Sequence, residues 1–230
     1  MKRAAHGTVW LFLWVGSFAI TLSSLVYFHA DELAPFVIEK LPLPREGFYV
    51  LVLRIHVIAA ALALPGCLML SSKLLLKRWP GFHRWGGRVT GGLVIFLLTP
   101  TGFYLAFFAR GGRGATLGFL LSGAVVLWAM IQAIRAARAG QFARHRRLTF
   151  HVLGQLSVAV SSRAMLFVLE SCNFNPDVAY RISLWIPVLG TFALVEFLTS
   201  PALFQLISRR IYDPIVHPAP SLRSPGADLG

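Results

Sequence analysis

The stretch PGFHRWGGRVTGG, residues 80–92, separates two long and mostly apolar segments of the sequence. It brings together His83, Arg84, Arg88 and a cluster of glycines. Short basic connectors between long apolar runs are typical of cytoplasmic loops in membrane proteins. We therefore interpret residues 80–92 as a cytoplasmic turn that joins two membrane-spanning helices.

A second stretch, ARHRRLTFHVLG at residues 143–154, has the same character. It contains His145, Arg146, Arg147 and His151, and it also lies between two apolar runs. The same argument predicts a second cytoplasmic turn. Each turn would close a helical hairpin at the cytoplasmic face.

The composition indicates that lipid, rather than water, surrounds most of the chain. Of the 230 residues, 56% are hydrophobic and only 13% are charged, and the mean hydropathy is +0.67. A soluble domain is about a quarter charged, so this chain would lack the polar surface that water requires. The net charge of +13 lies mainly in short connectors. We expect it to attract anionic lipid headgroups at the cytoplasmic face and not nucleic acid.

Six apolar runs are long enough to cross a bilayer. The predicted fold is all-α, a single domain of six transmembrane helices over residues 1–211, followed by a disordered cytoplasmic tail at residues 212–230. The predicted spans cover residues 8–28, 48–76, 88–108, 116–137, 148–171 and 180–207. Most of the 22 Lys and Arg side chains then lie on the side of the N-terminus, so the positive-inside rule places both termini in the cytoplasm.

Acidic side chains are missing from the centre of the sequence, between Glu46 and Glu170. Paired-carboxylate glycosidase chemistry and carboxylate-bridged metal sites are therefore excluded from that region. The sequence also contains neither a CxxC nor an HExxH motif. We accordingly expect no metal site other than haem iron.

Four ionisable side chains fall inside the predicted spans, where a charge is costly and needs a partner or a function. They are Arg54, His56, Arg163 and Glu196. His56 and Arg163 would lie at similar depth, each about 12 Å from the outer end of its helix. An Arg163–Glu196 ion pair would neutralise both charges, and it fits a structural role as well as a functional one.

In the functional interpretation, these side chains form a polar site in the outer half of the bundle. Arg163 could hold an anionic headgroup, a quinone carbonyl or a haem propionate. His56 could be a ligand or a proton carrier. Arg54 could belong to the same site or extend outward to the membrane interface.

Several histidines could hold haem iron, which requires two of them at one depth on facing helices. At the cytoplasmic side, His83 could pair with His151 or with His145. At the outer side, His29 could pair with His56. The same histidines equally fit ordinary interfacial positions, so both interpretations stay open.

Six short sequence features follow one another in a defined order along the chain. The set consists of RIH at residues 54–56, HRWGGR at residues 83–88, HRR at residues 145–147, Arg163, Trp185 and Glu196. It resembles the bacterial predicted membrane proteins of domain-of-unknown-function family 2306, from about Val50 to Glu196. The resemblance implies a multi-pass protein of the bacterial inner (cytoplasmic) membrane without an established activity. A looser similarity to four-helix b-type cytochromes motivates haem b as a cofactor.

These features predict a small integral membrane protein that holds haem b or a quinone-like molecule for electron transfer. His56, with Arg54 and Arg163, forms the predicted site, and His83 with His151 is the alternative pair of iron ligands.

The rival prediction is a non-enzymatic transporter, lipid-binding protein or assembly protein, in which Arg163 and Glu196 form a structural pair. The sequence leaves open whether the protein is an enzyme. It also leaves open whether the chain forms a homo-oligomer or joins a larger membrane complex.

Overall fold

The computed structural model describes residues 2–28, 35–38, 40–43 and 45–199. Within these ranges all regular structure is helical, which confirms the predicted all-α class. The chain divides into two compact units, Met1–Val195 and Glu196–Gly230. The predicted tail at residues 212–230 and the end of the sixth predicted span lie outside the described residues.

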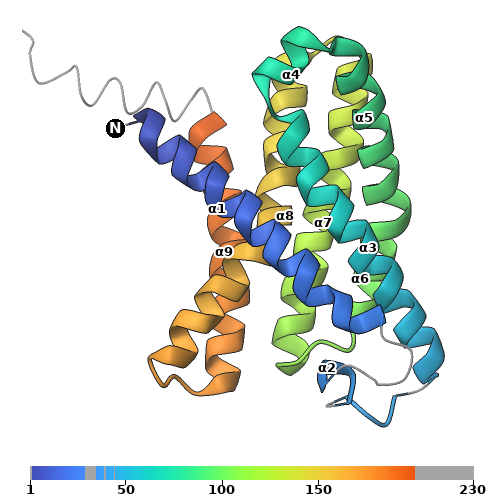
Figure 1. The fold of residues 1–230 in the computed structure, drawn as a ribbon, viewed down its shortest axis with the longest axis vertical. Coiled ribbons are helices and arrows are strands. Elements are labelled where there is room, and N and C mark those ends of the chain that lie inside the picture. The colour runs from blue at the N-terminus through green and yellow to red at the C-terminus, as the bar shows by residue number, and fades with distance from the viewer. Residues whose placement is uncertain (1, 29–34, 39, 44, 200–230) are drawn as a thin grey trace, which may run out of the picture. The chain divides into compact units, whose positions relative to one another are not determined.

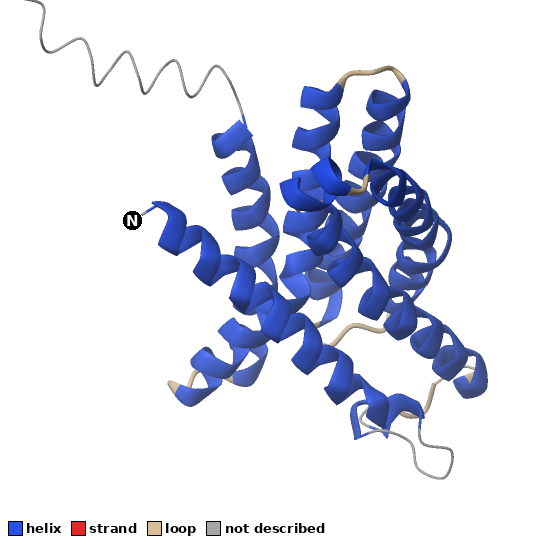
Figure 2. Ribbon diagram, turned by 45° about the horizontal axis from the view of Figure 1, so that its top comes forward, coloured by secondary structure: helices blue, strands red, loops and turns tan. Residues whose placement is uncertain are grey.

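The described helices follow one another through short connections (Figures 1 and 2). In chain order they are α1 (Lys2–Ser23), the 3-10 helix η1 (Ser24–Phe28), α2 (Pro35–Ile38), α3 (Glu46–Leu70), α4 (Lys73–Arg78), α5 (Pro80–Leu93), the π-helix η2 (Val94–Leu98), α6 (Thr99–Ala106), α7 (Gly112–Arg138), α8 (Phe142–Ser171) and α9 (Pro176–Thr199). Six helical segments are long and apolar enough to cross a membrane, with α5, η2 and α6 together forming one of them.

The first basic stretch is helical, which corrects the predicted turn. Residues 80–92 form most of α5, which begins at Pro80. Proline suits a first helical position because its φ angle is already helical and its missing N–H is not needed there. The bend between α3 and α5 instead consists of residues 71–72, the short helix α4 and Trp79. Trp79 interrupts the helix with φ −136° and ψ 70°.

The second basic stretch is also helical, because α8 already begins at Phe142. The turn before it shrinks to residues 139–141. Gly140 has φ +70° there, a left-handed conformation that glycine adopts without strain and that commonly ends a helix. The helices that contain the predicted spans 88–108 and 148–171 therefore begin before those spans, and α3 ends before the end of the predicted span 48–76.

Two glycines of α5, Gly86 and Gly91, lie where neighbouring helices approach closely. A Cβ atom at Gly86 would be 3.2 Å from Cδ2 of Leu70 in α3, and one at Gly91 would be 3.1 Å from Cδ1 of Ile134 in α7. Small residues that permit such an approach are common where helices meet inside membranes. Close helix packing therefore accounts for glycines that the sequence also allows in a turn.

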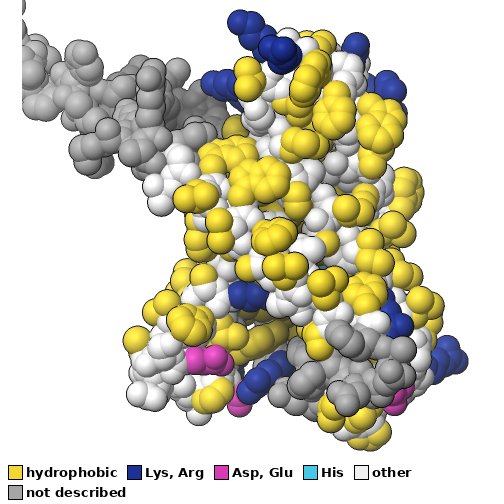
Figure 3. Space-filling model, in the orientation of Figure 1, with side chains coloured by type: hydrophobic (Ala, Val, Ile, Leu, Met, Phe, Trp, Pro, Cys, Tyr) yellow, Lys and Arg dark blue, Asp and Glu magenta, His cyan; other side chains and the backbone are white. Residues whose placement is uncertain are grey.

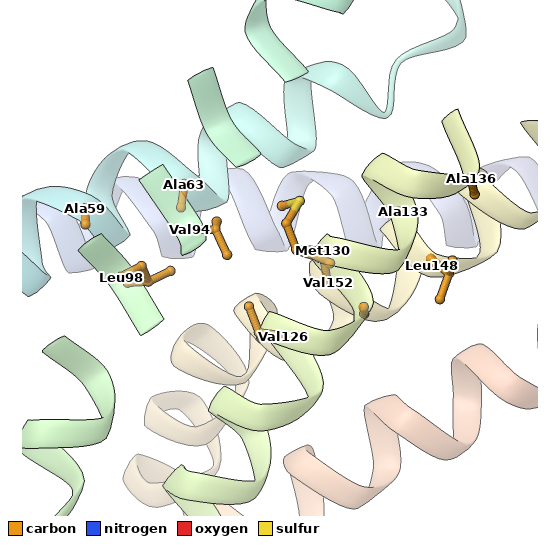
Figure 4. Close-up of a cluster of buried hydrophobic side chains, with 11 residues drawn as sticks. Ala59, Ala63, Val94, Leu98, Val126, Met130, Ala133, Ala136, Leu148 and Val152 are labelled. Carbon is orange, nitrogen blue, oxygen red and sulfur yellow. The ribbon is translucent and has the colours of Figure 1, made fainter. Parts of the chain in front are cut away.

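Helix α3 is central to the Met1–Val195 unit, since it contacts α1, α5, η2, α6 and α8, while α7 lies along α6 and α8. Small and medium side chains fill the space where α3, η2, α7 and α8 meet, as Figure 4 shows. Ala59 and Ala63 of α3 face Val94 of η2, Met130 of α7 and Val152 of α8 in this cluster.

Large apolar side chains cover the sides of the helices in Figure 3, as expected for a lipid-facing surface. The upper end in Figure 1 holds α4, the start of α5 and the α7–α8 turn, and Lys and Arg side chains gather at this end in Figure 3. The opposite end holds α2 and the α6–α7 and α8–α9 turns. The protein is therefore a polytopic membrane protein with one strongly basic end.

Candidate functional site

The predicted outer site is built around a local irregularity between α5 and α6. The π-helix η2 precedes Pro100, and neither a π-turn nor a proline preserves the regular hydrogen bonds of an α-helix. Thr99 donates its hydroxyl hydrogen to the Val94 carbonyl at 2.8 Å. The hydroxyl of Thr101 lies 2.6 Å from the Leu97 carbonyl. The Val94 carbonyl also accepts the backbone N–H of Thr99, so the hydroxyls add side-chain hydrogen bonds to the backbone of this irregular turn.

Thr101 also determines which nitrogen of the neutral His56 ring carries the hydrogen. The distance from Nδ1 of His56 to Oγ1 of Thr101 is 3.0 Å. Because a hydroxyl has one hydrogen and Thr101 donates it to a backbone carbonyl, its oxygen must accept the hydrogen of Nδ1. In the neutral ring, Nε2 of His56 therefore carries a lone pair that can accept a hydrogen bond or bind a ligand.

The absence of a side chain at Gly102 leaves room for the His56 ring. A Cβ atom at Gly102 would lie 3.1 Å from Cε1 of His56. His56 is neither fully buried nor fully exposed. The ring thus lies against α6.

Arg163 of α8 approaches His56 closely enough for the two side chains to interact electrostatically. It is exposed, about 12 Å from the end of α8 at Ser171. Its Nη1 donates to the Ala159 carbonyl at 2.8 Å. Within the described residues of the Met1–Val195 unit, no carboxylate forms an ion pair with Arg163. Glu196 belongs to the second unit, so the Arg163–Glu196 pair remains a prediction.

Tyr180 of α9 adds a phenol to this group. Its side chain interacts electrostatically with Arg163 and with Arg110 of the α6–α7 turn. Gly111 has φ +88°, and a Cβ atom there would lie 3.1 Å from Cδ1 of Tyr180. Lys and Arg side chains also border a hollow in the lower half of the face shown in Figure 3. We call His56, Thr101, Arg163 and Tyr180 the outer site.

Sequence reasoning identified His56 and Arg163 but missed Thr101, Gly102 and Tyr180. In the sequence, Pro100 between two threonines is a signal for a helix kink. This signal could have drawn attention to Thr101. Arg54, which was also predicted for this site, donates its Nε hydrogen to the Tyr27 carbonyl at 2.7 Å. That bond joins α3 to η1, so Arg54 has a structural contact of its own.

The histidines near the basic end separate into two environments. His83 lies close to the Leu70 carbonyl and to His145, and its buried Nδ1 has no hydrogen-bond partner. Nδ1 of His145 lies 2.9 Å from the Ala133 carbonyl, so this nitrogen carries the hydrogen. His151 is 3% exposed, and its ring centroid is 5.1 Å from that of Phe192 in α9.

These contacts bring His83 near His145, the second of the two predicted cytoplasmic pairings. The first pairing, His83 with His151, remains a prediction, and His29 lies outside the described residues. In the described part of the chain, no group of three or more His, Cys, Asp and Glu side chains is placed to hold a metal ion.

A separate polar network stabilises the centre of the bundle. Gln155 of α8 accepts a hydrogen bond from Ser122 of α7 at 2.8 Å. It donates to the Val188 carbonyl at 2.9 Å and to the Thr191 hydroxyl at 3.1 Å, both in α9. Because this buried amide is satisfied by the protein itself, we assign it to helix association and not to ligand binding.

Comparisons with known proteins place the chain in a family but provide no relative of known activity. No curated protein and no solved structure matches the chain. The looser similarity to b-type cytochromes therefore has no support from these comparisons. A family model described as "Predicted membrane protein (DUF2306)" matches residues 53–199, a range that contains the whole outer site. This match covers more than half of the sequence and confirms the resemblance seen in the motifs, so the chain belongs to the DUF2306 family of predicted membrane proteins.

Proposed function

We propose that the protein binds the headgroup of a quinone-like molecule at the outer site and thereby takes part in electron transfer. The observation that carries this proposal is the proximity of an acceptor nitrogen on α3 to an exposed cation on α8. Nε2 of His56 offers a lone pair, and the Arg163 guanidinium nearby has no carboxylate partner in the described first unit.

A quinone matches this combination of groups in both of its oxidation states. Its carbonyl oxygens accept hydrogen bonds, which Arg163 can donate, and the hydroxyl of the reduced quinol can donate to Nε2 of His56. The hydroxyl of Tyr180 offers a further donor or acceptor. An isoprenoid tail would remain in contact with the apolar sides of the helices.

Haem b is a second candidate, which a different observation favours. Metal-ligating histidines commonly donate their other ring hydrogen to a carbonyl, as Nδ1 of His145 does to Ala133. Nδ1 of His83, nearby, is buried without a partner. His83 and His145 are thus the better candidates for an iron-binding pair.

We expect a Soret band that is lost in His83→Ala and in His145→Ala. A colourless protein from cells supplied with haem would contradict this candidate.

The proposal includes a location in the bacterial inner membrane with both termini in the cytoplasm. The concentration of Lys and Arg at the end that holds α4 and the α7–α8 turn supports this orientation. A lipid-binding, transport or assembly role without redox chemistry is the alternative, and it requires Arg163 to bind a lipid headgroup or Glu196 in place of a quinone.

A titration with a short-chain ubiquinone tests the main proposal. The purified protein in detergent would be followed by tryptophan fluorescence, since Trp185 follows Tyr180 of the outer site on the same helix, α9. We expect saturable quenching, with the Kd raised about tenfold or more in His56→Phe and in Arg163→Gln, because each loses a hydrogen bond of about 1.5 kcal/mol or more.

The matched control is Arg181→Gln, which removes an exposed arginine of α9 that bonds the Asp177 carbonyl. This variant should bind with the Kd of the wild type. Quenching that never saturates, or an equal Kd in all three variants, would contradict the proposal.

A further inference from the structure

The basic end of the molecule has a second feature, a row of exposed aromatic and aliphatic side chains among its cations. In α4 and the start of α5, Trp79, Phe82 and Trp85 are 58%, 43% and 62% exposed, and Leu74 is 73% exposed. Exposed basic side chains alternate with them along the same two helices. These are Lys73, Lys77, Arg78, Arg84 and Arg88.

The neighbouring α7–α8 turn enlarges the same positive surface. The exposed basic side chains on the helix ends that this turn joins are Arg135 and Arg138 of α7 and Arg144 and Arg146 of α8, and we count them with the turn. No carboxylate occurs between Glu46 and Glu170, so none of the segments that form this surface supplies a compensating negative charge. We call the exposed side chains of α4, the start of α5 and the α7–α8 turn the basic–aromatic surface.

We infer that the basic–aromatic surface binds the headgroups of anionic phospholipids in the membrane leaflet. Lys and Arg side chains there can bind lipid phosphates. Tryptophan rings favour the level between headgroups and acyl chains, because one part of the ring is apolar and its N–H is polar.

Arg78 and Trp79 illustrate the arrangement. The guanidinium carbon of Arg78 lies 6.0 Å from the centre of the Trp79 ring, within the range of a cation–π contact. The ring can therefore hold the cation at the height of a phosphate while its apolar face contacts acyl chain. The surface is also continuous with the lipid-facing sides of the spans, which distinguishes a lipid from a soluble protein partner.

Quenching of tryptophan by brominated lipid tests this inference directly. The full-length protein would be reconstituted into phosphatidylcholine vesicles that contain either brominated phosphatidylglycerol or brominated phosphatidylcholine in equal amount. We expect stronger quenching by the anionic lipid, corresponding to a local enrichment on the order of twofold to fivefold. The difference should vanish in the Trp79→Phe/Trp85→Phe double variant, which assigns it to this surface.

Charge variants identify the cause of the preference. Arg78→Gln/Arg84→Gln should reduce the preference for the anionic lipid, whereas Arg110→Gln/Arg113→Gln removes two exposed arginines at the opposite end and should preserve it. High salt should weaken the preference of the wild type by screening, a test that requires no variant. Equal quenching by the two lipids in the wild type, or a preference unaffected by both the Arg78/Arg84 substitutions and salt, would overturn the inference.

Discussion

At the scale of single residues, the main result is that Thr101 fixes the hydrogen on one nitrogen of His56. The hydroxyl donates to a backbone carbonyl and accepts from Nδ1, so the free nitrogen is Nε2. A histidine in this state can accept a proton or a hydrogen bond from a ligand. The chemistry proposed for the outer site therefore depends on a threonine that does not itself need to touch the ligand.

The first prediction concerns this threonine. Thr101→Val keeps the shape of the side chain but leaves Nδ1 of His56 without its acceptor, so we expect unfolding free energy to fall by about 1 kcal/mol or more. The nitrogen chemical shifts of the imidazole should show loss of the single tautomer. Thr116→Val is the control, since that hydroxyl is exposed and bonds only the Gly112 carbonyl. Identical shifts in wild type and Thr101→Val would contradict the assignment.

The second prediction concerns the Arg163–Glu196 ion pair. If the two side chains interact, the stability losses in Arg163→Gln and Glu196→Gln will not add in the double variant. A coupling energy of about 0.5 kcal/mol or more, measured by thermal unfolding in detergent, is the result that the alternative, structural role of the pair predicts, whereas the quinone proposal predicts additive losses. Strictly additive stability losses would mean that Arg163 does not pair with Glu196 and can bind a ligand.

Depth along a helix was enough to predict that His56 and Arg163 lie in the same layer, because rise per residue is constant in an α-helix. The same reasoning could not find Thr101 or Gly102. The π-helix η2 shifts the register of the following residues, and a period of 3.6 residues does not describe that shift. Tyr180 was missed because the sequence around it does not indicate a functional residue. Only its interaction with Arg163 in the folded chain does so.

At the scale of helices, six spans could be predicted from apolar runs, whereas several of their ends could not. The two basic stretches contain many glycines and cations, which are also common in turns. In the folded chain Gly86 and Gly91 of α5 are contact points for α3 and α7, and the cations lie on exposed helical turns. Helix packing, which involves residues distant in sequence, decides between these two readings.

The third prediction tests such a contact between α7 and α9. A Cβ atom at Gly118 would be 2.8 Å from Cδ2 of Leu184, so Gly118→Ala should lower stability by about 1–3 kcal/mol. Combining it with Leu184→Ala removes the obstacle, and the two losses should be less than additive. Gly190→Ala, where no atom lies within 4 Å, is the matched control. Equal stability of Gly118→Ala and Gly190→Ala in thermal unfolding would contradict this packing.

At the scale of the whole molecule, charge separates the two ends of the Met1–Val195 unit. Ten basic side chains would face one leaflet if α4 and the α7–α8 turn are cytoplasmic; they are Lys73, Lys77, Arg78, Arg84, Arg88, Arg135, Arg138, Arg144, Arg146 and Arg147. The outer site then lies nearer the opposite leaflet. Ligand and anionic lipid would thus bind at different ends of the bundle, and each can be tested without the other.

The fourth prediction tests this orientation with a natural cysteine. Cys172 is exposed in the α8–α9 turn, whereas Cys67 is only partly accessible within α3. In a Cys67→Ser background, a membrane-impermeant thiol reagent should label Cys172 in intact spheroplasts. A cysteine introduced as Arg144→Cys should react only after lysis. The reverse pattern would invert the proposed orientation.

A quinone-like molecule held at the outer site should remain with the protein when it is purified from its own membrane. Protein purified in mild detergent would be extracted with organic solvent, and quinone per protein would be quantified by mass spectrometry. We expect bound quinone in the wild type and in Arg181→Gln, and strong depletion in His56→Phe and Arg163→Gln. Quinone at background level in the wild type, or equal amounts in all four proteins, would contradict the proposal.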